Sequence, residues 1–250
     1  MFVLAIVLFF SMIIVGGERG LTSFFTLVFN VLIMALTIYL IIFGINPLLV
    51  SFICGSLLAM VTLFYQNGIN EKTKAAFKSV TIITGVLIIF ATIFCVKTGV
   101  SGLNELNINE DSTFYLIGDI GINMMMVTVP MIIIGFMGAI TDTSIAVSSA
   151  AYEVYCNNPD IDEDKLYKSS INIGKSVLGT TINTLYFAMI GEGLMVFNVM
   201  VNYRYSLERL LNSSAFIELF GLVVFSAIAC VITIPVTAKV FTKQIFHKER

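Results

Sequence analysis

Long apolar runs, separated by short polar segments, make up most of the chain. A helix needs roughly 20 apolar residues to cross the hydrocarbon core of a bilayer. The first run begins at Met1 without a basic n-region, and Gly16–Gly20 is a poor cleavage site, so we interpret the run as a short first span and not as a signal peptide. The pattern predicts about seven transmembrane helices, over residues 1–15, 21–43, 47–65, 79–96, 116–140, 177–201 and 215–241.

Local signals refine two of these spans. Asn46 followed by Pro47 is typical of an N-cap with proline at the first helical position, so the third span should begin there. Pro130 interrupts the fifth span, where the missing backbone donor favours a kink or hinge. The helical pattern of the fifth span continues past Asp142 to about Tyr155.

The composition agrees with a membrane protein. Apolar residues make up 58% of the chain and charged residues 12%, about half of what a soluble domain carries. No stretch is left for a separate soluble domain. We therefore predict an all-α, polytopic integral membrane protein with a single transmembrane domain over residues 1–250, whose surroundings are the lipid bilayer. A net charge of −2, without a basic patch, argues against a nucleic-acid partner.

Basic residues predict the orientation. With seven spans and the N-terminus outside, only Lys97, Arg204 and Arg209 lie on the outer side. The other 11 of the 14 Lys and Arg residues then lie on the cytoplasmic side, as the positive-inside rule requires. We expect an outside N-terminus and a cytoplasmic C-terminus.

Two stretches carry polar residues where apolar ones are expected. The first, Gly138–Tyr155, contains Asp142, Ser148 and Glu153 among small residues that allow close helix packing. The second, Gly174–Gly193, lies in the sixth predicted span. Its candidate polar residues are Thr180, Asn183, Thr184 and Glu192. Gly179 and Gly191 of this stretch, like Gly138 of the first, are candidate positions for close helix packing.

Polar groups are costly in hydrocarbon and are retained where they meet one another, water or a ligand. Helix rise places Asp142 at the depth of Thr180 and Asn183, near the inner surface, and places Glu192 in the outer half. One hypothesis is a polar intramembrane site in which Asp142 holds a cation or a proton, with oxygen atoms of the sixth span completing the shell. The helix of the first stretch should then pack near the Gly179–Gly191 face.

Simpler interpretations stay open for each of these groups. Asn183 and the two threonines suit hydrogen bonding between helices. Asp142 suits an interfacial position in contact with water, and Glu192 suits an ion pair with Arg204 or Arg209.

The sequence gives no sign of catalysis, of a cofactor or of a metal site. The single histidine, His247, cannot build a zinc site, and no HExxH, GxSxG or Walker A motif occurs. The acidic cluster Asp160–Asp164 lacks the glycine and the final glutamate of an EF-hand. We therefore expect no enzyme activity and no catalytic residues.

The two polar stretches carry a family resemblance. GAITDTSIAVSSAAYEV (Gly138–Val154) and GKSVLGTTINTL (Gly174–Leu185), together with the opening GGERGL, resemble the YibE/F-like family of bacterial membrane proteins, and the chain is similar to a single-module F-type member. The resemblance covers essentially the whole chain. It implies a Gram-positive-type cell membrane and a companion YibE-type membrane protein, but no established activity.

Two functional hypotheses follow. The first is a permease or channel-like transport subunit for a small solute or ion, favoured by the polar cluster in the absence of an ATPase motif. The second is an assembly or regulatory subunit that does not transport and acts in a complex with the companion. Small-residue faces favour this second hypothesis and also leave a homo-oligomer open.

Overall fold

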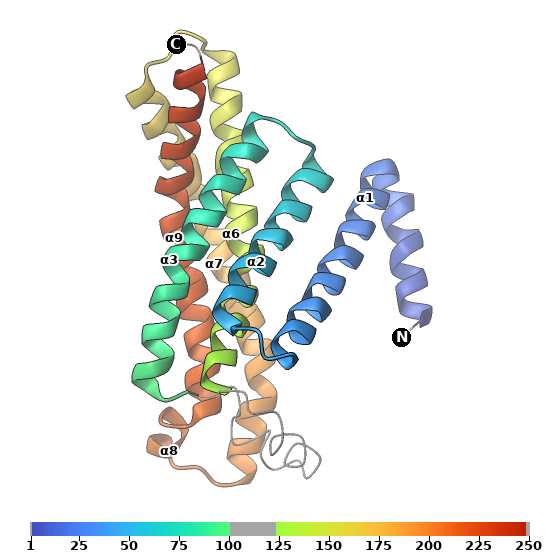
Figure 1. Ribbon diagram of the computed structural model, residues 1–250, viewed down its shortest axis with the longest axis vertical. Helices are drawn as coiled ribbons and strands as arrows, with labels where there is room; N and C mark the ends of the chain where they lie inside the picture. Colours follow the sequence, from blue (N-terminus) through green and yellow to red (C-terminus); the bar gives the residue numbers. More distant parts are fainter. Residues whose placement is uncertain (1, 101–123, 249–250) are drawn as a thin grey trace.

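The computed structural model describes residues 2–100 and 124–248 of the chain. The start of the predicted fifth span and most of the connection before it lie outside the described residues. The described elements are all helical (Figure 1), and they are α1 (Phe2–Ile42), α2 (Pro47–Met60), the π-helix η1 (Val61–Tyr65), α3 (Glu71–Thr98), α6 (Met124–Asn157), α7 (Glu163–Asn202), α8 (Leu207–Leu211) and α9 (Ser214–Lys248).

Among the described residues, six helical segments are long and apolar enough to cross a membrane. The all-α membrane architecture is thereby confirmed. The first segment, Val3–Ile42, contains both the first and the second predicted span. The count of seven and the orientation of the termini stay predictions.

The α1 helix reverses direction within the predicted break between the first two spans. Gly17 has φ 54° and ψ −130°, a conformation that is strained for a residue with a side chain. Figure 1 shows the two arms of α1 running antiparallel at the edge of the bundle. The arms approach closely, because the Phe9 and Phe24 rings lie 4.8 Å apart and a Cβ at Gly20 would collide with the carbonyl oxygen of Met12.

Caps determine where the next helices begin and end. The predicted N-cap is confirmed, since Asn46 accepts a hydrogen bond of 2.9 Å from the Leu48 amide. Asn70 and Thr73 form a reciprocal capping box at the start of α3. Gly99 ends α3 in the left-handed conformation, with φ 67°.

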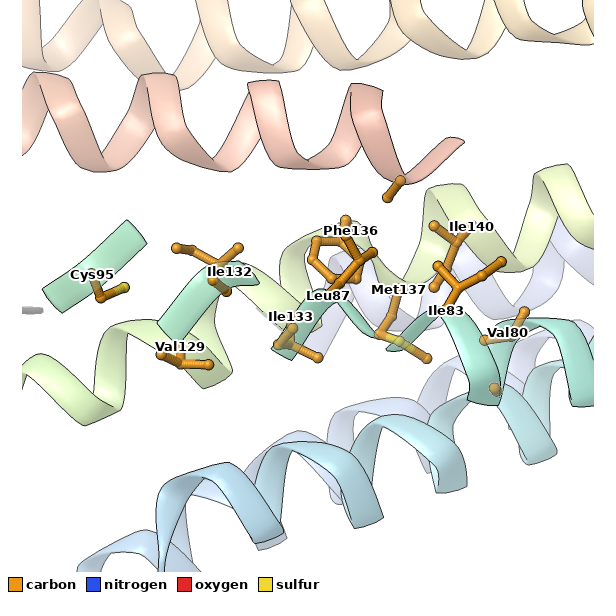
Figure 2. Close-up of a cluster of buried hydrophobic side chains, with 13 residues drawn as sticks. Val80, Ile83, Leu87, Cys95, Val129, Ile132, Ile133, Phe136, Met137 and Ile140 are labelled. Carbon is orange, nitrogen blue, oxygen red and sulfur yellow. The ribbon is translucent and has the colours of Figure 1, made fainter. Parts of the chain in front are cut away.

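The core lies between α3, α6 and α9. Figure 2 shows side chains of α3 and α6 interdigitating, among them Leu87, Ile133 and Phe136, all buried. Lipid tails are as apolar as these side chains, so close van der Waals packing holds the helices together in place of the hydrophobic effect. Glycines permit that packing at Gly135, where a Cβ would collide with Leu222, and at Gly174, where it would collide with Ile234.

Apart from α1, which reverses at Gly17, four of the described helices are longer than a bilayer requires, namely α3, α6, α7 and α9. The α7 helix has 40 residues and α9 has 35, so at about 1.5 Å per residue each exceeds the roughly 30 Å hydrocarbon core. The prediction that the fifth span continues as helix to about Tyr155 is confirmed by α6. Figure 1 shows the α6–α7 turn, the connection between α2 and α3 and the C-terminus at one end of the bundle, which we call the basic end because most Lys and Arg residues of the chain lie there.

Candidate functional site

One face of α6 is open, although this helix is the most buried of the candidate spans. Its buried face carries Ile133, Phe136 and Ile140. The opposite face carries side chains or glycines that recur every three or four residues, which places them in one line along the helix. We call this line the open face of α6; from its outer end, named after the orientation that the basic residues predict, to the basic end it consists of Met131, Gly135, Gly138, Asp142, Ile145 and Ser149.

Asp142 lies in the middle of the open face. Its side chain is exposed, and in the described part of the chain it forms no hydrogen bond or ion pair. Cys230 of α9 is close enough to interact with it electrostatically. A carboxylate in this position within a candidate span requires water, an ion or another chain as its partner.

The polar face of α7 is also open. Thr180, Asn183 and Thr184 are exposed, and the two threonine hydroxyls donate to carbonyls of their own helix, at 2.8 Å to Val177 and 3.0 Å to Thr180. No hydrogen bond joins these groups to Asp142 within the described residues. The polar side chains of α7 therefore do not bond Asp142 directly, and a site shared by the two helices stays a prediction.

Helix α7 packs through its other face, which includes Gly174 and Leu178. A Cβ at Gly138, Gly179 or Gly191 would meet no atom within 4 Å. The described residues thus provide no close packing at these three glycines. The physical reason is that α7 contacts α6 through the face that carries Gly174, whereas Thr180, Asn183 and Thr184 lie on a different face of α7.

The remaining residues singled out in the sequence are dispersed. Ser148 is fully buried, and its hydroxyl donates to the Ile145 carbonyl at 3.2 Å, so it belongs to the packed side of α6. Glu153 is exposed at the basic end. Pro130 is buried, and α6 runs through it as one helix.

A small cavity of about 200 Å³ adjoins the outer end of the open face. We call it the outer pocket. Glu192 and Glu218 line it together with Gly135 and Met131 of α6. Glu192 forms no ion pair with Arg204 or Arg209 within the described residues, and Arg209 instead lies 4.2 Å from the Tyr205 ring centroid.

A larger cavity of about 570 Å³ adjoins the basic end of the open face. We call it the inner pocket. Sequence reasoning missed it, because its walls come from three segments that are distant in the chain. The one available signal was Ser149, which stands seven residues after Asp142 and therefore on the same helix face. The lining residues are Arg19, Ser23, Gln66, Asn67, Asn70, Lys72, Thr73, Ile145 and Ser149.

The open face of α6 thus has a pocket of different charge at each end. Carboxylates line the outer pocket, basic side chains line the inner pocket, and Asp142 lies between them. The described residues contain no group of three or more His, Cys, Asp or Glu side chains arranged to hold a metal ion.

Comparison with known proteins gives one finding. Residues 4–247 match the family described as YibE/F-like protein. No curated protein and no solved structure matches the chain. The match covers nearly the full length and includes both polar stretches, so the chain belongs to the YibE/F-like family.

Proposed function

We propose that the chain is a membrane transport subunit that moves a small solute or ion along the open face of α6. The observation that carries the proposal is the line of residues from Met131 to Ser149, which has the outer pocket at one end, the inner pocket at the other and the exposed Asp142 between them. Polar or charged groups that line such a path in a membrane protein are typical of solute and ion pathways.

The composition of the open face suits a pathway. Gly138 leaves the backbone of α6 uncovered beside Asp142, since a Cβ there would meet no atom within 4 Å. Asp142 supplies a single carboxylate between the pockets, where it can bind a hydrated cation or exchange a proton. Any energy coupling would come from an ion gradient or from a partner, since the chain carries no ATPase motif.

Proteoliposomes test this proposal with Asp142→Asn, which removes the charge and keeps the size of the side chain. Vesicles with the wild-type chain should show flux of at least one probe among protons, K⁺, Na⁺, phosphate and acetate, above the flux of empty vesicles. Asp142→Asn should abolish that flux at an unchanged level of inserted protein. The matched control is Asp162→Asn, an exposed residue at the basic end, which should transport like the wild type.

Flux that is equal in Asp142→Asn and wild-type vesicles would remove Asp142 from the pathway. Transport would be rejected altogether if no probe showed flux in proteoliposomes or in vesicles prepared from the native membrane.

A second function is favoured by a different observation. In the most apolar stretch of α7 only 12% of the residues are buried, compared with 56% in that of α6. The exposed residues of α7 include polar side chains, which are costly to leave in contact with lipid. Exposed threonine and asparagine side chains in a membrane helix suit hydrogen bonds to another helix. We therefore also propose that α7 is covered by a second membrane chain, either a companion YibE-type protein or another copy, for which this chain acts as an assembly subunit.

Cross-linking distinguishes the two chains that could cover α7. Cysteine at Thr184 should cross-link to the second chain in native membranes, whereas cysteine at Leu178, which packs inside the bundle, should not. Mass spectrometry of the cross-linked product identifies the partner. Equal reaction at both positions would contradict a specific interface.

A further inference from the structure

The inner pocket carries positive charge without a matching carboxylate. Arg19 and Lys72 are its charged lining residues, and neither forms an ion pair within the described part of the chain. Two other lysines at the basic end have a carboxylate nearby, since Lys74 lies 3.5 Å from Glu71 and Lys165 lies 3.2 Å from Asp162. The two cations of the pocket therefore have no counterion among the described residues.

The wall of the pocket is built by hydrogen bonds of its own. Gln66 donates to the Ser23 hydroxyl at 3.1 Å and so links η1's C-terminal end to α1. Asn67 donates to the Thr62 carbonyl at 3.2 Å, and Asn70 donates to the Asn67 carbonyl at 3.1 Å. These amides hold the turn before α3 in one shape, so the cavity is formed before any ligand arrives.

Three groups in the pocket are left for a ligand. Arg19 and Ser149 make no side-chain hydrogen bond within the described residues, although Ser149 is half-buried. The ammonium of Lys72 lies 5.4 Å from the centroid of the Tyr152 ring, which holds the side chain of Lys72 in place without neutralising it. The guanidinium, the ammonium and the hydroxyl can all donate hydrogen bonds.

We propose that the inner pocket binds a small oxyanion bearing a phosphate or carboxylate group, held by Arg19, Lys72 and Ser149. Guanidinium and ammonium groups form their strongest hydrogen bonds with such anions, and an arginine can hold two oxygens at once. A volume of about 570 Å³ accommodates the anion with its water, since ligand sites span roughly 300–1,000 Å³. The proposal concerns binding, so it does not depend on whether the protein transports a solute.

The same phosphate chemistry has two sources at a membrane surface, a free anion and the headgroup of an anionic phospholipid. Basic pockets between helices at the cytoplasmic surface suit both. The pocket lies where Arg19, just after the turn of α1, meets the start of α3. The experiment therefore includes one arm for each source.

The first arm measures thermal unfolding of the purified, delipidated full-length protein in neutral detergent. Inorganic phosphate should raise Tm in a saturable manner, compared with chloride at equal ionic strength, because a ligand of the folded state stabilises it. Arg19→Gln and Lys72→Gln should each weaken the apparent affinity about tenfold or more, since each removes a charged donor. Lys72→Arg, which keeps the charge, should retain the phosphate effect.

The matched control is Lys168→Gln, because Lys168 is exposed on α7 near the basic end and does not line the pocket. Its phosphate titration should coincide with that of the wild type. A variant that fails to fold is recognised by its Tm in chloride, and in that case the comparison rests on the other glutamine variant and on Lys72→Arg.

The second arm repeats the titration in nanodiscs of phosphatidylcholine with and without phosphatidic acid. A lipid occupant predicts that phosphatidic acid raises Tm and removes the response to phosphate, and a free anion predicts that the response persists in both. Either result supports the proposal and identifies the source. A wild-type protein that responds to neither phosphate nor phosphatidic acid, or glutamine variants that respond like the wild type, would overturn it.

Discussion

Ser144 of α6 and Thr237 of α9 place their hydroxyl oxygens 2.9 Å apart in the fully buried core. Ser144 also donates to the carbonyl of Ala76 in α3 at 3.2 Å, so Thr237 is the donor in the first bond. One small side chain therefore connects the three helices that form the core. Because the alternative partners in hydrocarbon are few, such a connection favours one arrangement of these helices over others.

Ser144→Ala should lower the free energy of unfolding by about 1 kcal/mol, because hydrogen bonds between membrane helices contribute roughly 0.6–1.7 kcal/mol. Unfolding in mixed detergent micelles provides the measurement. Ser176→Ala is the control, since the Ser176 hydroxyl is exposed and bonds the Ile173 carbonyl of its own helix. Equal stability of the two variants would show that the Ser144 connection contributes nothing.

Gly174 and Gly179 provide a matched pair on α7. A Cβ at Gly174 would collide with Ile234 and lie 3.2 Å from Val147, whereas a Cβ at Gly179 would meet nothing within 4 Å. Gly174→Ala should destabilise the protein by about 1–3 kcal/mol, as overpacking does. Gly179→Ala should be neutral or stabilising by up to about 1 kcal/mol, because alanine is the better helix former.

The same unfolding assay measures both glycine variants in the isolated chain. A larger loss for Gly179→Ala than for Gly174→Ala would contradict the arrangement of α7. If Gly179→Ala is harmless in the isolated chain but prevents cross-linking through Thr184 in native membranes, the open face of α7 is where the second chain packs.

Cysteine labelling tests the orientation predicted from basic residues. In a background without the 4 native cysteines, a cysteine at Glu208 in α8 should react with a membrane-impermeant reagent from outside. A cysteine at Asp162, in the turn between α6 and α7, should react only after permeabilisation. Reaction of position 162 in intact cells would reverse the topology and place the inner pocket on the outer side.

Much of the fold could be predicted because each signal is local. Apolar runs of the length of a bilayer, the Asn46–Pro47 start of α2 and the continuation of α6 past Asp142 depend only on neighbouring residues. Thr180, Asn183 and Thr184 follow a spacing of i, i+3 and i+4, which is one helix face, and the structure shows the three together on the exposed side of α7.

The partners of these faces could not be predicted, because they depend on how the helices are rotated against one another. Bulky side chains at the contacts fix that rotation: Ile234 meets α7 at Gly174, one face away from the polar residues. The inner pocket was missed for a related reason, since Arg19 and Lys72 come to line one cavity only once α1 has packed against α2 and η1.

Gly16 and Gly20 flank the reversal of α1, and only one of them is in close contact. A Cβ at Gly20 would collide with the Met12 carbonyl oxygen, whereas a Cβ at Gly16 would meet no atom within 4 Å. Gly20→Ala should therefore push the two arms of α1 apart, and Gly16→Ala should leave them in place. Cysteines at positions 9 and 24 report the separation of the arms through disulfide formation, since the ring centroids of Phe9 and Phe24 lie 4.8 Å apart.

We expect the disulfide to form in the Gly16→Ala background and to be largely lost in the Gly20→Ala background. Equal disulfide formation in both would mean that the arms do not rely on the backbone contact at Gly20. Because Arg19 stands next to Gly20, loss of the hairpin should also remove the phosphate response of the inner pocket, which links the fold of α1 to the proposed anion site.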